Sequence, residues 1–427
     1  MILIDVRRVA VRGAVVLAGL LCVSAAAAEW TLESSIARAL AVAPEVAAAA
    51  AGREAQQGAL RQAGAWPNPS VELRADDRLA RELGGGGRDL TQIAITQPLP
   101  LGRIKPRQAV AAAGVRVAEA AEQAERLGLE RRVAEAFHRL QRDQALLALA
   151  RGNAEDAAAF AHAGARRAAA GDVSRREALR LEVMAAQAAQ AVEQAEGEWA
   201  ESAYALAALL ALAPDELGAL APLTVPPPPA ALEHFAQGAA DHPSLHHEQG
   251  RQAVLTAERA VARAEALPGV SLTLYRERDV FAGSREPVTG AGLTVELPLW
   301  DRRGGRRDEL AALGRAQRER VRTLERDLQA ELRVSHLHLT HLVDQARHHR
   351  GAVLEPAREV RALTERGYQR GEVDLPALID AVETARAAEG RQQQLLADAW
   401  LELAALRHAA GEALHAVTTT DFEEAGR

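Results

Sequence analysis

The sequence predicts a mainly α-helical protein with a small β part, in which one structural plan occurs twice. Three features predict this class. Long segments place apolar residues three and four positions apart, as on one face of a helix. Two pairs of short segments alternate apolar and polar residues, as in strands. The same small glycine turn, at Gly171 and again at Gly371, interrupts each of two long helical segments.

The composition indicates helix packed against helix and excludes some partners. The chain has 427 residues, of which 48% are hydrophobic but only 3% aromatic. Alanine occupies many apolar positions, so helices can approach closely. The formal net charge is −7, and the arginine-rich segments also contain acidic residues, which argues against nucleic acid as a partner. The best uncharged apolar run, Tyr204 to Ala213, falls well short of the roughly 20 residues of a membrane-spanning helix.

Residues 1–28 predict a secretory signal peptide. Three arginines precede an apolar run, residues 14–23, and small residues follow it up to Ala28. A short buried N-terminal helix is one alternative. Another is lipid modification of Cys22, the only cysteine, although Leu21 is bulkier than the residue that usually precedes a lipidated cysteine. Once residues 1–28 are removed, the chain has no cysteine for a disulfide, a metal site or a nucleophile.

Two repeats are expected, residues 29–221 and 231–412, with a proline-rich linker at 222–230 and a flexible tail at 413–427. Each repeat should contain an entry helix, then a strand hairpin, then an antiparallel coiled-coil hairpin. The expected entry helices are residues 32–63 and 232–266. The expected strands are about residues 70–79 and 89–98, then 270–280 and 289–298. The expected coiled-coil hairpins are about residues 104–213 with a tip at 171, and 305–410 with a tip at 371.

The strands are predicted by strict alternation. Val71 and Leu73 alternate with Glu72 and Arg74, and the second repeat shows the same pattern. Strands of about nine to eleven residues can cross a bilayer at a tilt. Four strands cannot close a barrel, and an open edge is costly in lipid, so two copies of the chain would share eight strands or three copies would share twelve. A small soluble sheet is the alternative.

The helical hairpins are predicted by long uninterrupted patterns. Residues 105–170 contain no proline beyond the first turn and would extend about 100 Å at about 1.5 Å per residue. The return helices, Leu181 to Leu206 and Leu375 to Leu406, place leucine, valine and alanine at heptad spacing. Such seams indicate antiparallel coiled coils whose tips are the glycine turns.

The repeated order of elements and two motifs resemble the TolC-type outer membrane efflux protein family over essentially the whole mature chain. GYQRGEVDLPALIDA, residues 367–381, is similar to the family's tip motif, and TQPLPLG, residues 96–102, to the end of its second strand. The resemblance is strongest to the cobalt-zinc-cadmium heavy-metal efflux outer membrane component. The corresponding ELPLWDRRG of the second repeat and a thin aromatic girdle depart from the pattern. The resemblance implies a homotrimer with a 12-stranded outer-membrane β-barrel continued by a periplasmic α-helical barrel.

The function that the resemblance implies is passive export through an outer membrane duct.

 The implied duct belongs to a tripartite efflux system of the resistance-nodulation-division type and exports heavy metal ions through the cell outer membrane. Its implied partners are two further copies of the chain, a periplasmic membrane-fusion adaptor, an inner-membrane proton-driven pump and outer membrane lipid.

Other functions stay open at this point. One is a duct for multidrug efflux or type I protein secretion. Another, of a different class, is a periplasmic coiled-coil adaptor or scaffold, against which the strand length and the duplication argue. The sequence shows no nucleophile constellation, nucleotide loop or metal-hydrolase motif, so we expect no catalytic residues, no cofactor and no enzyme activity.

The resemblance makes the two tips the candidate site, where an adaptor would dock and the channel would be gated. Glycine there permits the positive φ of a helix end and close helix approach. Asp172 and Asp374 are expected to cap the return helices, and capping alone would explain their residue type. The candidate docking and gating residues are Gly171, Asp172, Arg175, Glu177, Gly367, Tyr368, Arg370, Gly371, Asp374 and Asp380.

Histidines on one long helix are secondary candidates, for metal binding. His338, His341 and His348 share a helix face at a spacing that suits Zn²⁺ or Cu²⁺. No H-E-x-x-H motif accompanies them, and the polar face of a long helix also explains them. We therefore expect no resident metal, and the resemblance favours metal as cargo.

Overall fold

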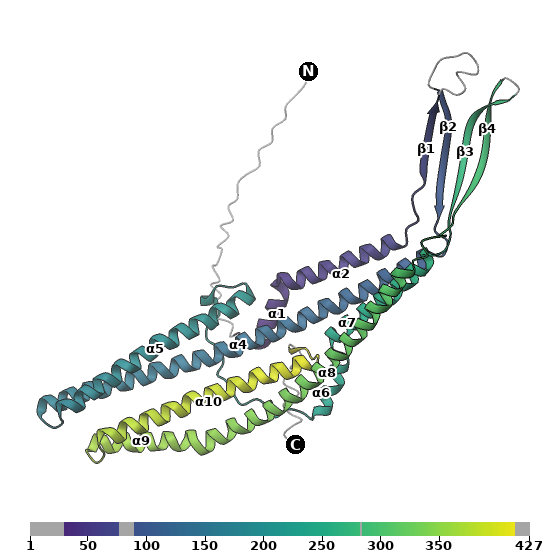
Figure 1. Ribbon diagram of the computed structural model, residues 1–427. Helices are drawn as coiled ribbons and strands as arrows, with labels where there is room; N and C mark the ends of the chain where they lie inside the picture. The colour runs from purple at the N-terminus through teal and green to yellow at the C-terminus, as the bar shows by residue number, and fades with distance from the viewer. Residues whose placement is uncertain (1–29, 77–88, 282–283, 415–427) are drawn as a thin grey trace, which may run out of the picture.

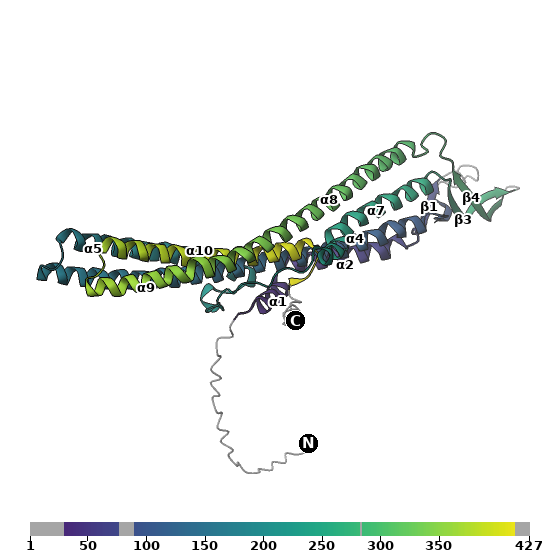
Figure 2. The ribbon, with the colours of Figure 1, turned by 90° about the horizontal axis from the view of Figure 1, so that it is seen from below.

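The computed structural model describes residues 30–76, 89–281 and 284–414. Figures 1 and 2 show an elongated molecule with a sheet at one end and the turns of two helical hairpins at the other. The predicted signal peptide with Cys22, the glycine-rich segment 84–87 and residues 415–427 of the predicted tail lie outside the described residues.

The predicted duplication of helix, strand hairpin and long helical hairpin is confirmed. The first repeat contains α1 (Leu32–Val42), α2 (Pro44–Ala63), β1 (Ser70–Asp76), β2 (Asp89–Leu99), α4 (Ile104–Ala170) and α5 (Arg175–Leu210), and the 3-10 helix η1 (Pro214–Glu216) follows it. The second repeat contains α6 (Leu232–Ala240), α7 (Pro243–Glu265), β3 (Gly269–Phe281), β4 (Ser284–Glu296), α8 (Gly304–His349), the π-helical turn η2 (Arg350–Leu354), α9 (Glu355–Arg370) and α10 (Leu375–Ala409).

The entry helices differ from the prediction. Single helices over residues 32–63 and 232–266 are wrong, because Pro44 and Pro243 each begin a new helix. Proline has no N–H to donate and its ring clashes with a preceding turn, so it belongs in the first turn of a helix. α1 and α2 meet at an angle of 51°. Within the described chain, no single helix is long and apolar enough to cross a membrane. Taken together, α1 and α2 are long and apolar enough, but they are bent.

The long helix of the second hairpin is interrupted, whereas α4 is continuous. α8 passes into η2 before α9 begins with Pro356 in its first turn. Because Pro356 has no N–H, a carbonyl in the preceding turn lacks its usual hydrogen-bond donor. The wider π-helical turn η2 makes room for the proline ring at this point. Nε2 of His349 lies 2.9 Å from the carbonyl oxygen of Ala388 and ties this region to α10.

The helix α4 is central to the molecule. It packs against α2 and α7 in the half near the sheet and against α5 and α10 toward the tips. In the tip half the helices lie in the order α5, α4, α10, α9 (Figure 1). The largest apolar cluster lies where α1 folds onto α4 and α5, and it includes Ile36, Leu129, Val133, Phe137, Leu140, Leu206 and Leu210.

The four strands form one antiparallel sheet in the order β1-β2-β3-β4. The pairing of β2 with β3 joins the two repeats, and the hydroxyl oxygens of Thr96 and Thr273 lie 2.9 Å apart across it. β4 begins at Ser284 rather than at residue 289, because its pairing with β3 extends to Phe281.

Candidate functional site

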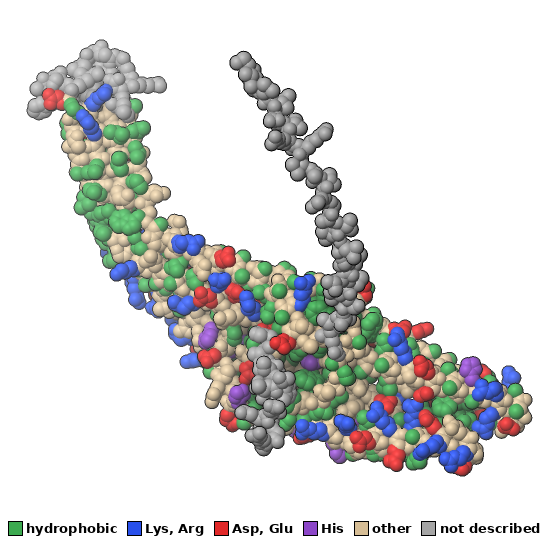
Figure 3. Space-filling model, turned by 180° about the vertical axis from the view of Figure 1, so that it is seen from behind, with side chains coloured by type: hydrophobic (Ala, Val, Ile, Leu, Met, Phe, Trp, Pro, Cys, Tyr) green, Lys and Arg blue, Asp and Glu red, His purple; other side chains and the backbone are tan. Residues whose placement is uncertain are grey.

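One face of the sheet is apolar and exposed. Residues directly opposite each other in antiparallel strands point to the same face, and the register pairs Val71 with Ile95 and Ile95 with Leu274. The exposed apolar side chains of this face are Val71, Leu73, Ile93, Ile95, Leu272, Leu274, Leu293 and Val295. Figure 3 shows hydrophobic side chains, without charges among them, over the middle of this end of the molecule. A contiguous apolar surface of this kind marks an interaction with lipid or protein.

The opposite face of the sheet is polar. Glu72 and Arg74 form an exposed ion pair there at 3.1 Å. The register adds Thr273 and Thr294 to the same face. The end strands β1 and β4 each have a neighbour on one side only, so the sheet has two unpaired edges.

Charged and aromatic side chains mark the two ends of the apolar face. Arg276 and Arg278 follow Leu274 along β3 toward the hairpin end. At the helical end Trp66 and Trp300 are 60% and 93% exposed. Exposed tryptophans gather at membrane–water interfaces, so their position at this end is the one expected for the border of a membrane-facing band.

The first tip is a glycine turn followed by a serine cap. Gly171 ends α4 with φ +85°, and the N–H of Asp172 donates to the carbonyl of Arg167 at 2.9 Å. The prediction that Asp172 caps α5 is wrong. Ser174 is the cap, because its oxygen accepts from the N–H of Glu177 at 3.3 Å while the Glu177 carboxylate accepts from the Ser174 N–H at 2.9 Å.

The second tip repeats this geometry with an aspartate cap. Gly371 ends α9 with φ +75°, and the N–H of Glu372 donates to the carbonyl of Gly367 at 2.9 Å. Asp374 caps α10, as expected, by accepting from the N–H of Ala377 at 3.1 Å. A Cβ at Gly171 or Gly371 would meet nothing within 4 Å, so in the protomer positive φ alone explains these glycines.

Gly367 and Tyr368 are buried, unlike the other tip candidates. Tyr368 packs with Leu181 of the first hairpin and Leu378 of the second, and the Arg167 guanidinium lies 5.4 Å from its ring centroid. A Cβ on Gly367 would lie 2.6 Å from Cγ2 of Val373. Tyr368 therefore holds the two hairpins together within one protomer, whereas Gly367 leaves room for Val373 inside the second hairpin.

The remaining tip candidates are charged residues, and most of them are exposed. Arg175, Asp374 and Asp380 are exposed, and Glu177 is partly buried. Arg370 pairs with Glu372 at 3.7 Å rather than with either aspartate. A further ion pair, between Arg361 of α9 and Asp156 of α4, links the two hairpins.

A groove at the tip, which sequence reasoning missed, lies between α5 and α10. Its volume is about 550 Å³. Leu179 and Val183 of α5 line it although they are 47% and 57% exposed, and Arg175, Arg176 and Arg180 add positive charge. Leu179 and Val183 do not occupy the heptad positions of the seam that contains Leu181. Apolar residues outside those positions are the sequence signal for this groove.

The histidine candidates do not converge. His338, His341 and His348 are exposed along α8. Among the described residues, no group of three or more histidine, cysteine or acidic side chains is placed to hold a metal ion.

Comparison with known proteins gives the family. The family model of the outer membrane efflux proteins matches residues 35–212, which span α1 to α5. This match assigns the first repeat, α1 to α5, to the outer membrane efflux protein family. The name of this family places its members in the outer membrane.

Two curated relatives are similar to a larger share of the chain. The chain is 30% identical to Protein CyaE of Bordetella pertussis over 305 residues, covering 68% of this chain and 60% of the relative. It is 27% identical to the cobalt-zinc-cadmium resistance protein CzcC of Cupriavidus metallidurans over 288 residues, covering 66% of each. The chain thus spans between 60% and 66% of the length of these curated relatives. A solved structure of CusC shares the fold with a TM-score of 0.74 at 17% identity, over 90% of this chain and 93% of that one.

Proposed function

We propose that three copies of the chain form the outer membrane exit duct of a tripartite efflux system of the resistance-nodulation-division type. The observation that carries the proposal is a sheet with one apolar face, one polar face and two unpaired edges. Each unpaired backbone group in lipid costs several kcal/mol, so sheets of several copies close into one barrel. Three copies supply twelve strands, with the apolar face toward lipid and the polar face toward a water-filled lumen.

The helical hairpins would continue the barrel as a tube in the periplasm. Val353, Val360 and Leu363 lie along the outer helix of the second hairpin and are 42%, 52% and 54% exposed. A neighbouring copy would cover them, since a head-to-tail contact repeated around a threefold axis closes a ring.

The tips would receive the periplasmic adaptor. The groove between α5 and α10 is open, partly apolar and lined by arginines. An amphipathic helical hairpin with an acidic polar face fits such a groove. An inner-membrane pump driven by protons would supply the energy.

Heavy metal ions are the proposed cargo. The name of the relative CzcC refers to cobalt, zinc and cadmium resistance. On the polar face of the sheet, Glu72, Glu277 and Glu296 accompany Arg74, an excess of carboxylates that favours cations in a lumen. Drug-like molecules or a secreted polypeptide are the alternatives that the test distinguishes.

The test has a structural part and a functional part. Light scattering of the mature chain in mild detergent should give the mass of three copies, and a monodisperse monomer with intact β content would overturn the duct. A deletion strain should lose resistance to cobalt, zinc and cadmium and regain it on complementation. Loss of drug resistance alone, or of polypeptide secretion alone, would reassign the cargo.

A further inference from the structure

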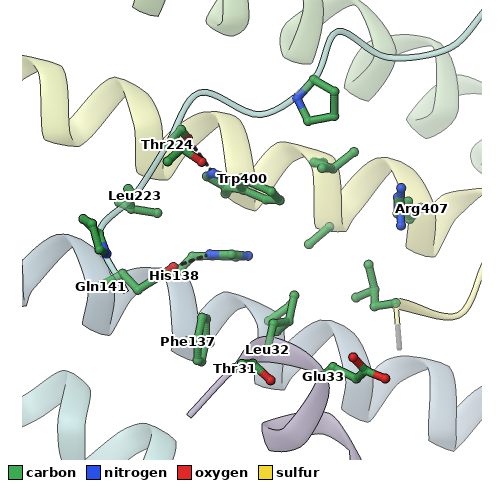
Figure 4. A pocket seen from close by; sticks show the side chains of 16 residues that line it. Thr31, Leu32, Glu33, Phe137, His138, Gln141, Leu223, Thr224, Trp400 and Arg407 are labelled. Carbon is green, nitrogen blue, oxygen red and sulfur yellow. Dashed lines mark hydrogen bonds between the residues drawn. The ribbon is translucent and has the colours of Figure 1, made fainter. Parts of the chain in front are cut away.

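A cavity of about 280 Å³ lies where the first repeat, the linker and the second repeat meet (Figure 4). Its walls come from the start of α1, the middle of α4, the linker and the end of α10. The apolar side chains that line it are Leu32, Ala134, Phe137, Pro222, Leu223, Pro227, Trp400, Leu403, Ala404 and Leu414. None of the sheet or tip candidates lines it, so the cavity is independent of the proposed duct.

His138 presents a neutral hydrogen-bond acceptor to this cavity. Its side chain is 5% exposed and stacks on Trp400, with ring centroids 5.0 Å apart and planes 23° apart. Nε2 of Gln141 donates to the carbonyl of Ala221 at 2.7 Å, so the carbonyl oxygen of the Gln141 side chain faces Nδ1 of His138 at 2.8 Å. Nδ1 therefore carries the proton and Nε2 carries the lone pair.

The free nitrogen of His138 points into the cavity. Figure 4 shows the ring edge away from Gln141 directed into the open space. Within the described part of the chain, Nε2 makes no hydrogen bond. Burial lowers the pKa of His138 to about 4, so the ring stays neutral and Nε2 stays an acceptor at neutral pH.

Arg407 supplies a positive charge on the other side of the cavity. Figure 4 places its guanidinium across the open space from His138. Its Nε is buried without a hydrogen-bond partner in the described chain. The carboxylate of Glu33 also lines the cavity, but no ion pair joins it or another described carboxylate to Arg407. Arg407 is only partly buried, but its Nε lacks the acceptor that a buried donor requires.

We propose that this cavity binds a small aromatic acid that carries a hydroxyl group opposite its carboxylate. The carboxylate pairs with Arg407, the hydroxyl donates to Nε2 of His138, and the ring lies between the apolar walls beside Trp400. Arg407 has only donors and Nε2 only accepts, so a ligand needs an acceptor at one end and a donor at the other. The volume suits a single ring rather than a drug-sized molecule.

Calorimetric titration of the assembled, mature protein tests the proposal. The probe is 4-hydroxybenzoate. The control compound is 4-methylbenzoate, in which a methyl group of nearly equal size replaces the hydroxyl. Both probes are anions, which keeps them out of the detergent micelle. We expect 4-hydroxybenzoate to bind about tenfold more tightly, the size expected of one hydrogen bond to a buried group. His138→Phe should remove this difference, and Arg407→Met should weaken both acids at least about tenfold.

Matched variants and a second measurement complete the test. His162→Phe on α4 and Arg391→Met on α10 replace exposed residues of the same types and should leave both affinities unchanged. If His138→Phe does not assemble, crystals of the unaltered protein soaked with 3-bromo-4-hydroxybenzoate should show the bromine signal inside the cavity. The proposal would be overturned if the two acids bound with equal affinity or if the bromine signal lay outside the cavity. It would also be overturned if detergent or residues 415–427 occupied the cavity.

Discussion

The guanidinium of Arg131 lies 3.5 Å from Nδ1 of His408. Arg131 also pairs with Glu135 at 2.9 Å and with Glu331 at 3.3 Å, so this one side chain joins α4, α8 and α10. Burial, then Arg131, then His242 lower the pKa of His408 to about 4. Protonation of His408 would place a second positive charge against Arg131, in the region that holds the two repeats together.

We therefore expect stability to fall as the pH drops from about 6.5 to about 4. The histidine titrates near 6.5 in the unfolded chain and near 4 in the folded chain, so between these values the unfolded state binds the proton first. The contribution of His408 is complete above pH 6.5 and is lost as the pH falls through 4. His408→Gln should flatten the fall of the melting temperature, followed by circular dichroism. The exposed His162→Gln is the matched control, and a parallel profile in both variants would contradict the prediction.

A second prediction concerns the charges beside Gly371. Asp374→Asn with Asp380→Asn should raise single-channel conductance in planar bilayers. In the proposed trimer these aspartates would pair with arginines of neighbouring tips, each exposed pair would contribute only about 0.2–1 kcal/mol, and three symmetric sets would add up. Asparagine keeps the cap that Asp374 provides, whereas alanine would remove it at a cost of about 1 kcal/mol. Unchanged conductance in an assembled trimer would place the gate elsewhere.

A third prediction concerns the ion pair between hairpins. Arg361 of α9 pairs with Asp156 of α4. Arg361→Met should loosen the contact between hairpins and raise the frequency of channel opening. Arg358→Met is the matched control, because Arg358 pairs with Glu389 at 2.7 Å within the second hairpin. If both variants open equally often, the pair between hairpins does not restrain the tip.

The repeated plan was predictable because helix and strand periodicities are local properties of the sequence. Other local signals were present but overlooked. Pro44 and Pro243 mark the breaks in the entry helices. Ser174 with Glu177, three residues later, is a capping box that identifies the start of α5 better than Asp172 does.

The rest of the site depends on contacts between distant segments. The burial of Tyr368 arises because the second hairpin packs on Leu181 of the first. The cavity beside His138 exists because Trp400 of α10 stacks on that ring and donates to the carbonyl of Thr224 in the linker at 2.8 Å. Neither contact leaves a periodic signal in the sequence, since each joins segments that only the folded chain brings together.

A fourth prediction concerns the groove between α5 and α10. Leu179→Asp with Val183→Asp should leave assembly and conductance unchanged, because both side chains are about half exposed in the protomer. An adaptor hairpin that buries them should lose at least about tenfold in affinity, since each apolar side chain contributes about 1.5 kcal/mol or more when fully buried. Copurification with the adaptor measures this, and Leu337→Asp on α8, also exposed, is the control. Equal recovery of adaptor with both variants would exclude the groove as the docking site.

The last prediction concerns Gly371 itself. Leucine at φ +75° costs roughly 1 kcal/mol, and no atom lies within 4 Å of the added Cβ, so Gly371→Leu trimers should assemble and insert with a slightly lower melting temperature. The new side chain would project from the turn into the space that a docked adaptor needs, and export should fail. Gly197→Leu adds the same side chain to an exposed helical position of α5 with nothing within 4 Å, and it should leave export intact. If cells with Gly371→Leu trimers keep full resistance to every exported compound, the turn ends a helix and does nothing more.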